Sequence, residues 1–121
     1  MSSRSPHLYL LMALVFCCKI ASAQTDTTFW FAAPDLQEAH GDRPIFLRFS
    51  TSNTAASITI SQPANPGFTP ISINIAANSS NSVNLTTVIS QIENATPNTV
   101  SNKGLLIRSN SPISCYYDIA N

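Results

Sequence analysis

The stretch that decides the fold is Ala56-Ser57-Ile58-Thr59-Ile60-Ser61-Gln62, followed by Ile71-Ser72-Ile73-Asn74-Ile75. In both segments isoleucine occupies alternate positions, and serine, threonine or asparagine stands between. Successive side chains of a β-strand point to opposite faces, so this period predicts strands with one buried and one wet face, as in antiparallel sheets. Residues 63–70 between them hold three prolines and Gly67, which predicts a loop of fixed shape.

Outward from these two strands, further short apolar runs are bounded by proline, glycine and polar residues. They predict a first strand at Thr27–Ala33, a second at Pro44–Ser50, and a closing hairpin made of Lys103–Ser109 and Pro112–Ile119. Many short alternating segments separated by turns are typical of sandwiches and barrels. The predicted fold class is therefore all-β: an antiparallel β-sandwich of about seven short strands.

One segment departs from the period of two. Leu85, Val88, Ile89 and Ile92 fall at i, i+3, i+4 and i+7, which is the spacing of one face of a helix. We predict one short helix of about two turns that crosses an end of the sheets, with Thr86 as its cap. The alternative is a further irregular strand.

The N-terminal segment 1–23 has the form of a secretion leader. Its apolar run, Leu8–Phe16, is shorter than the about 20 residues that a membrane-spanning helix needs. Ala21-Ser22-Ala23 then supplies the small residues that a signal peptidase accepts. We predict cleavage after Ala23, a domain at 24–121, and a secreted or cell-surface location. Lys19 within the apolar stretch speaks against the alternative, an N-terminal membrane anchor, so no membrane span is expected after cleavage.

The composition that remains after cleavage limits the function classes. Cys115 is then the only cysteine, so no internal disulfide can form. Six acidic residues stand against four basic ones, and the basic residues do not cluster. A face that binds nucleic acid needs clustered Lys and Arg to neutralise phosphates, so nucleic acid is excluded as a partner.

Ionisable residues gather in one place only, the loop between the first two predicted strands: Asp35, Glu38, His40, Asp42 and Arg43. Carboxylates and imidazole suit Zn²⁺ or Ca²⁺, but the spacing matches neither a helical His-x-x-x-His site nor an EF-hand. A solvated surface loop predicts the same composition, as does a loop stabilised by its own ion pair and hydrogen bonds. We keep these residues as a possible ligand loop and assign no metal ligand or cofactor.

Catalytic residues are not assigned either. There is no Gly-x-Ser-x-Gly elbow, and His40 is the only histidine after the leader. Cys115 shares the inward face of its strand with Ile113, Tyr117 and Ile119, where a thiol is usually inert packing. The aromatic residues Trp30, Phe31 and Phe46 are interpreted mostly as core packing.

Two segments carry a family resemblance: Phe29-Trp30-Phe31-Ala32-Ala33-Pro34-Asp35 and His40-Gly41-Asp42-Arg43-Pro44-Ile45-Phe46-Leu47-Arg48. With Ile58–Pro66 and Asn102–Ile107, they resemble the N-terminal part of large secreted surface proteins of gliding bacteria. That region is similar to the IgGFc-binding protein N-terminal domain family. The resemblance implies a β-rich, adhesin-like module, and no residue that binds immunoglobulin can be carried over.

These observations favour a non-catalytic binding or adhesion module, the N-terminal part of a larger secreted protein. Its expected partners are an extracellular protein or glycan and downstream domains of the same chain. The alternative is a carbohydrate-recognising accessory domain of a secreted enzyme. Because Pro112–Ile119 is apolar and closes the chain, we also expect it to be an exposed edge strand, left unpaired until downstream sequence covers it. The alternative is a central strand whose neighbours are Lys103–Ser109 and the first strands.

Overall fold

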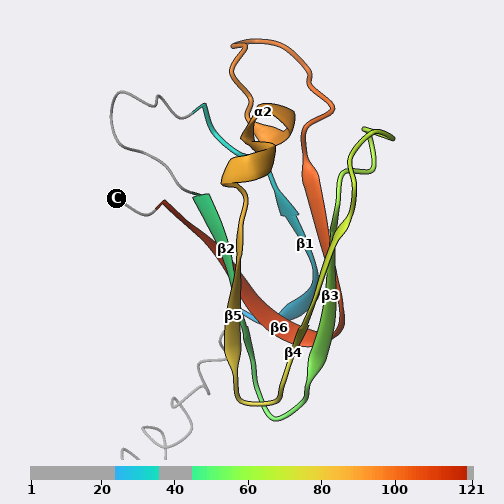
Figure 1. Ribbon diagram of the computed structural model, residues 1–121, viewed down its shortest axis with the longest axis vertical. Helices are drawn as coiled ribbons and strands as arrows, with labels where there is room; N and C mark the ends of the chain where they lie inside the picture. Colours follow the sequence, from blue (N-terminus) through green and yellow to red (C-terminus); the bar gives the residue numbers. More distant parts are fainter. Residues whose placement is uncertain (1–23, 36–44, 120–121) are drawn as a thin grey trace, which may run out of the picture.

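The computed structural model describes residues 24–35 and 45–119, and within them it confirms the predicted all-β fold. A single antiparallel sheet contains six strands in this part of the chain (Figure 1): β1 (Asp26–Phe31), β2 (Ile45–Thr51), β3 (Ala56–Ser61), β4 (Ile71–Ile75), β5 (Ser80–Asn84) and β6 (Leu105–Ile119). The order is β4-β3-β6-β2-β5, and β1 also pairs with β6. The sheet folds over on itself, so its inner face encloses the core.

The long strand β6 belongs to both layers of this sandwich. Its first half pairs with β1 along one edge and with β3 along the other, and β4 continues beyond β3. Its second half, residues 113–119, pairs with β2, which in turn pairs with β5. Figure 1 shows β6 curving between the two layers.

The predicted closing hairpin is therefore wrong, because both of its arms are parts of one strand. The ladder with β3 ends at Ser109 and the ladder with β2 begins at Ile113. Residues 110–112 between them form the corner, where Pro112 has no N–H to donate to a ladder. The polar, proline-containing segment 110–112 predicted a turn that reverses the chain. In the structure it is a bend at which β6 passes from one layer to the other.

The expected edge position of this last segment is only half right: residues 113–119 pair with β2 along one edge, and beyond Ile113 the other edge has no strand partner in the described part of the chain. β6 lies in the middle of the sheet order, with β3 and β2 following one another along the same edge. On the opposite edge, β1 pairs from Leu105 as far as Ile113. Within the described residues, the first half of β6 is thus paired along both edges and the second half along one.

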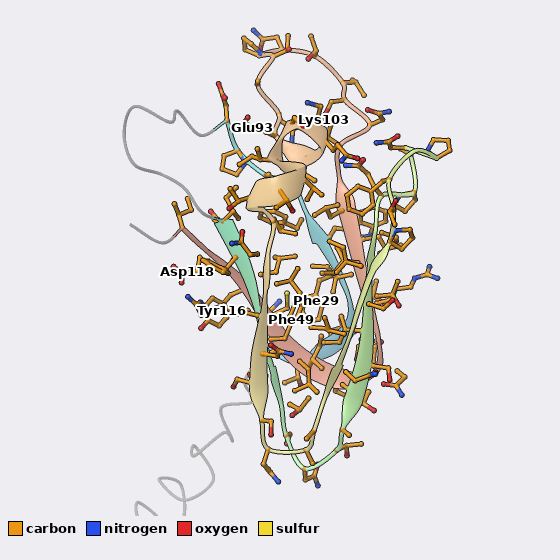
Figure 2. The ribbon with its side chains drawn as sticks, in the orientation of Figure 1. Phe29, Phe49, Glu93, Lys103, Tyr116 and Asp118 are labelled. Atoms are coloured by element: carbon orange, nitrogen blue, oxygen red, sulfur yellow. The ribbon has the colours of Figure 1, made fainter. Side chains whose placement is uncertain are left out.

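The core forms where the alternating side chains of both layers meet. The central members of β2, Ile45, Leu47 and Phe49, are each at most 1% exposed. Ile58 and Ile60 of β3 face them from the other layer with Ile107 of β6. Figure 2 shows Phe29 of β1 and Phe49 of β2 pointing into the space between the layers. At roughly 25 cal/mol per Å² of apolar surface, this burial is the main stabilising contribution in a domain without a disulfide.

The predicted helix is confirmed and closes one end of the sandwich (Figure 1). A 3-10 turn, η2 (Thr86–Val88), runs directly into α2 (Ile89–Ile92). Leu85 and Ile92 are fully buried, and Val88 and Ile89 pack against the core, as the spacing predicted. Thr86 is not the cap, because its hydroxyl has no hydrogen-bond partner while its N–H donates to Asn84 Oδ1 at 2.8 Å.

Two side chains attach this helical segment to the sheet. Lys103 Nζ donates to the carbonyl oxygens of Ser90 and Glu93, at 3.1 and 2.8 Å, near the end of α2. The buried Gln62, just after β3, donates through Nε2 to the carbonyls of Gln91 and Lys103. A positive charge and amide donors thus satisfy carbonyls that a helix end leaves free.

Candidate functional site

The predicted ligand loop is only partly within the described residues. Asp35 is exposed just after β1, and Glu38, His40, Asp42 and Arg43 lie outside the described residues. Across residues 24–35 and 45–119, no three His, Cys, Asp or Glu side chains come together as metal ligands would. The predicted ligand loop as a whole therefore stays a prediction.

Cys115 lies on the inner side of β6, as its alternation predicted. It is half-buried, pairs with Phe49 across the β2–β6 ladder and packs against the core. Desolvation by this burial raises the pKa of the thiol to about 11. Since the thiolate is the reactive form, the thiol is poorly suited to nucleophilic chemistry at neutral pH.

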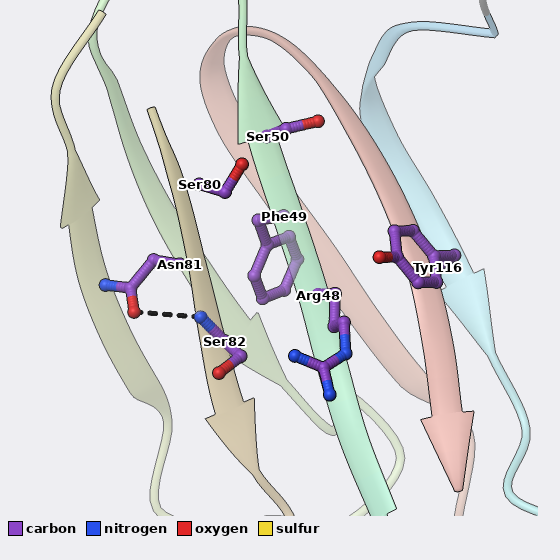
Figure 3. A pocket seen from close by; sticks show the side chains of 7 residues that line it. All are labelled: Arg48, Phe49, Ser50, Ser80, Asn81, Ser82 and Tyr116. Carbon is purple, nitrogen blue, oxygen red and sulfur yellow. Dashed lines mark hydrogen bonds between the residues drawn. The ribbon is translucent and has the colours of Figure 1, made fainter. Parts of the chain in front are cut away.

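The most distinctive surface is a hollow of about 380 Å³ on the outer face of the layer made by β5, β2 and β6. It is lined by Arg48, Phe49, Ser50, Ser80, Asn81, Ser82 and Tyr116 (Figure 3). We call this surface the serine hollow. Phe49 is buried in the core, so its side chain points away from the hollow and its strand supplies the floor.

The strand register explains the shape of the serine hollow. Ser82, Arg48 and Tyr116 form one row across the three strands, and Ser80, Ser50 and Ser114 form the next. Neighbouring strands lie about 4.8 Å apart, so each row is a line of adjacent side chains on one face. The serine side chains are short, whereas the arginine and tyrosine of the neighbouring row are long. The serine row is therefore a depression, and the arginine and tyrosine form its wall on one side.

Arg48 is held in place by two neighbours from the row beyond. Its Nε and Nη2 both donate to Oδ2 of Asp118, each at 2.7 Å. Its guanidinium carbon also lies 5.3 Å from the centre of the Phe46 ring, within the range of a cation–π contact. The wall of the hollow is therefore a positioned guanidinium whose charge is compensated.

The other lining groups are available to a ligand. Tyr116 is 59% exposed, and Ser80 and Ser82 are exposed as well, whereas Asn81 pairs with Phe49 and so has its side chain on the other face of the sheet. Figure 3 shows the Tyr116 side chain reaching from β6 toward the hollow. Each serine hydroxyl is both a donor and an acceptor, so the floor offers hydrogen bonds of either sense. What the site can do chemically is bind a polar molecule against one aromatic ring.

The aromatic residues that the sequence assigned to the core divide between the two faces. Phe31 packs against the core, whereas Phe46 lies on the outer face beside Arg48. Trp30 is 67% exposed, so core packing is the wrong interpretation for this residue. It pairs with Leu106 across the β1–β6 ladder, on the outside of the other layer.

Sequence reasoning missed the serine hollow because it missed β5. Ser80–Asn84 contains one buried apolar residue, Val83, among serines and asparagines, which are poor strand formers. One signal was present: Val83 and Leu85 continue a period of two on the inward face, and both are buried. The polar partners of that alternation, Ser80 and Ser82, are the residues that line the hollow.

No family model, curated protein or solved structure matches this chain. The resemblance to surface proteins of gliding bacteria therefore stays a prediction. In the described ranges, no helix is both long enough and apolar enough to cross a membrane.

Proposed function

We propose that this chain is exported and acts outside the cytoplasm as a non-catalytic binding or adhesion module. The observation that carries the proposal is the serine hollow, where exposed hydroxyls lie beside an exposed tyrosine and a positioned arginine. Tyrosine and serine, with occasional arginine, are also residues that antibody loops use for recognition. The leader at residues 1–23 would deliver this surface to extracellular partners.

The placement of the hollow on paired strands supports binding rather than turnover. Its lining residues come from β2, β5 and β6, which are held by two continuous ladders. Sites on sheet strands are rigid and precise, which lowers the entropy cost of holding a ligand. The ionisable pair beside it, Arg48 and Asp118, is satisfied internally at 2.7 Å.

Adhesion under flow tests the proposal. Beads coated with the purified chain should be retained on at least one of three surfaces: a neutral polysaccharide, an acidic polysaccharide or a protein without glycans. Tyr116→Ala should reduce that retention, whereas Trp30→Ala, which removes the exposed aromatic ring of the other layer, should leave it unchanged. Retention equal to that of inert beads on all three surfaces, or release of soluble products from any of them, would contradict the proposal.

A second candidate is an accessory domain that recognises carbohydrate for a secreted enzyme. The specific observation in its favour is the combination of an exposed tyrosine with a floor of serine hydroxyls. The reading frame around this sequence separates the two candidates. Adjacent adhesin repeats and a sorting domain would support the first, and a hydrolase domain the second.

A further inference from the structure

The serine hollow is polar, open and uncharged overall. The strands that form it, β5, β2 and residues 113–119 of β6, carry two charged side chains, Arg48 and Asp118. These two side chains pair with each other through two contacts of 2.7 Å. A ligand with net charge would find no uncompensated opposite charge on this face. The free-energy cost of removing water from its charge would therefore not be offset by an ion pair.

The hydroxyl groups that line the hollow are free to bind a ligand. Within the described ranges, no hydrogen bond is made by the side-chain hydroxyls of Ser50, Ser80 or Ser82. The hydroxyl of Tyr116, a residue that is 59% exposed, is likewise without a partner among these residues. Such groups are satisfied by water in the free protein and can exchange it for a ligand rich in hydroxyls.

The size and lining of the hollow narrow the ligand class further. A volume of about 380 Å³ lies within the roughly 300–1,000 Å³ range of small-molecule sites. Those sites are usually lined by apolar side chains, and this one is not. A protein partner usually needs an apolar centre that loses its water on binding. On this face Arg48 already covers Phe46, which leaves Tyr116 as the exposed ring, so a protein partner is disfavoured.

From these observations we infer that the serine hollow binds neutral saccharides. A sugar ring has an apolar face of C–H groups that can lie on the ring of Tyr116, and hydroxyls that can bond to Ser50, Ser80 and Ser82. Arg48 fits this role, because its guanidinium offers N–H donors at the wall of the hollow while Asp118, outside the hollow, compensates its charge. The inference rests on the proposed binding function and names its ligand class.

The test is a titration followed by NMR on the isotope-labelled purified chain. The probes are cellotetraose, mannotetraose and chitotetraose as neutral oligosaccharides, and tetragalacturonate as an acidic one. At least one neutral probe should give saturable shifts at the amides of Ser50, Ser80, Ser82 and Tyr116, and the acidic probe should not. Tyr116→Ala should weaken this binding by about tenfold, the size of one lost aromatic contact, and Trp30→Ala should not change it.

A charge variant tests the compensation argument separately. Asp118→Asn leaves the guanidinium of Arg48 unpaired, so it should gain binding of tetragalacturonate while the fold, followed by amide dispersion, stays intact. Failure of all neutral probes to saturate at millimolar concentration, or shifts confined to another surface, would overturn the inference. Tyr116-dependent adhesion to a protein surface without glycans would also overturn it, but would leave the proposed binding function standing.

Discussion

Phe31 of β1 and Tyr117 of β6 place their ring centres 5.1 Å apart with 44° between the ring planes. The two residues belong to different layers of the sandwich, since Phe31 pairs with Leu105 and Tyr117 pairs with Leu47. Beyond Ile113 the edge of β6 that faces β1 has no strand partner in the described part of the chain. This aromatic contact therefore joins the two layers where the sheet does not close.

Tyr117→Ala should destabilise the fold by about 1 kcal/mol, the typical value of a tilted aromatic pair beyond its buried area. Tyr116→Ala is the matched control, because the neighbouring ring is exposed to a similar extent on the opposite face. Its cost should stay within about 0.5 kcal/mol. Urea unfolding of both variants measures the difference, and equal losses would refute a role for the contact. In binding assays the order should reverse, with Tyr116→Ala the damaging change.

Trp30 is the single tryptophan of the chain and is 67% exposed, so its fluorescence reports on the solvent. We expect the emission maximum of the folded protein to lie near that of indole in water and to shift little on unfolding. Acrylamide and iodide should both quench it. A blue-shifted emission that is protected from iodide would mean that Trp30 is covered.

The period-two segments were predictable because each obeys a local rule. Isoleucine alternates with a small polar residue in β3 and β4, and one face of such a strand must be buried. The helical stripe from Leu85 to Ile92 follows a similar local rule. In β1, by contrast, Phe29, Trp30 and Phe31 are all aromatic, so the alternation does not show which of them face the core. The exposed position of Trp30 was missed for this reason.

The candidate site was beyond the reach of local rules. The serine hollow exists because Ser82, Arg48 and Tyr116 meet in one register row from three strands that are distant in sequence. The corner at residues 110–112 shows the same limit. A proline between two apolar runs predicts a break in pairing, but whether the chain reverses or bends depends on which strands pair with each half.

The pKa of the Cys115 thiol, raised by burial to about 11, makes stability depend on pH in the alkaline range. Below the ordinary pKa of the thiol, both the folded and the unfolded chain keep the proton, and the contribution is fully present. As pH rises toward 11 the unfolded chain loses the proton first, so stability falls. Melting temperatures at pH 8 and pH 10 should differ less in Cys115→Ala than in the unchanged chain. A pH dependence identical in the two proteins would show that the thiol does not contribute.

Expression with secretion should yield a chain that begins at Gln24. Signal peptidases cut after small residues, and Ala21-Ser22-Ala23 follows the apolar run at Leu8–Phe16. N-terminal sequencing after removal of any pyroglutamate, or intact mass, measures this directly. Ala23→Arg should block or shift the cut, while Ala33→Ser, outside the leader, should leave it in place. Exported protein that retains Met1 would overturn the assignment.

Gln62 should be the most sensitive polar residue of the described chain, because its amide joins three segments at the helical end. The side chain is 4% exposed. Nε2 donates to the carbonyls of Gln91 and Lys103 at 3.0 and 2.9 Å, and Oε1 accepts from Asn65 Nδ2 at 2.6 Å. Gln62→Leu keeps a similar volume but leaves these groups without their partner. A buried polar group without a partner costs about 1–3 kcal/mol.

We therefore expect Gln62→Leu to lower the free energy of unfolding by about 2–3 kcal/mol, a large part of the stability of a domain this small. Gln91→Ala is the control, since that side chain is exposed and its carbonyl, which accepts from Gln62, is kept. Its change should be within about 0.5 kcal/mol. Hydrogen exchange should speed up in Gln62→Leu around α2 and the β3–β4 loop, ahead of global unfolding, because those segments lose their shared anchor. A variant as stable as the unchanged chain would mean that water replaces the amide at no cost, and that packing of Leu85 and Ile92 alone holds the helical end in place.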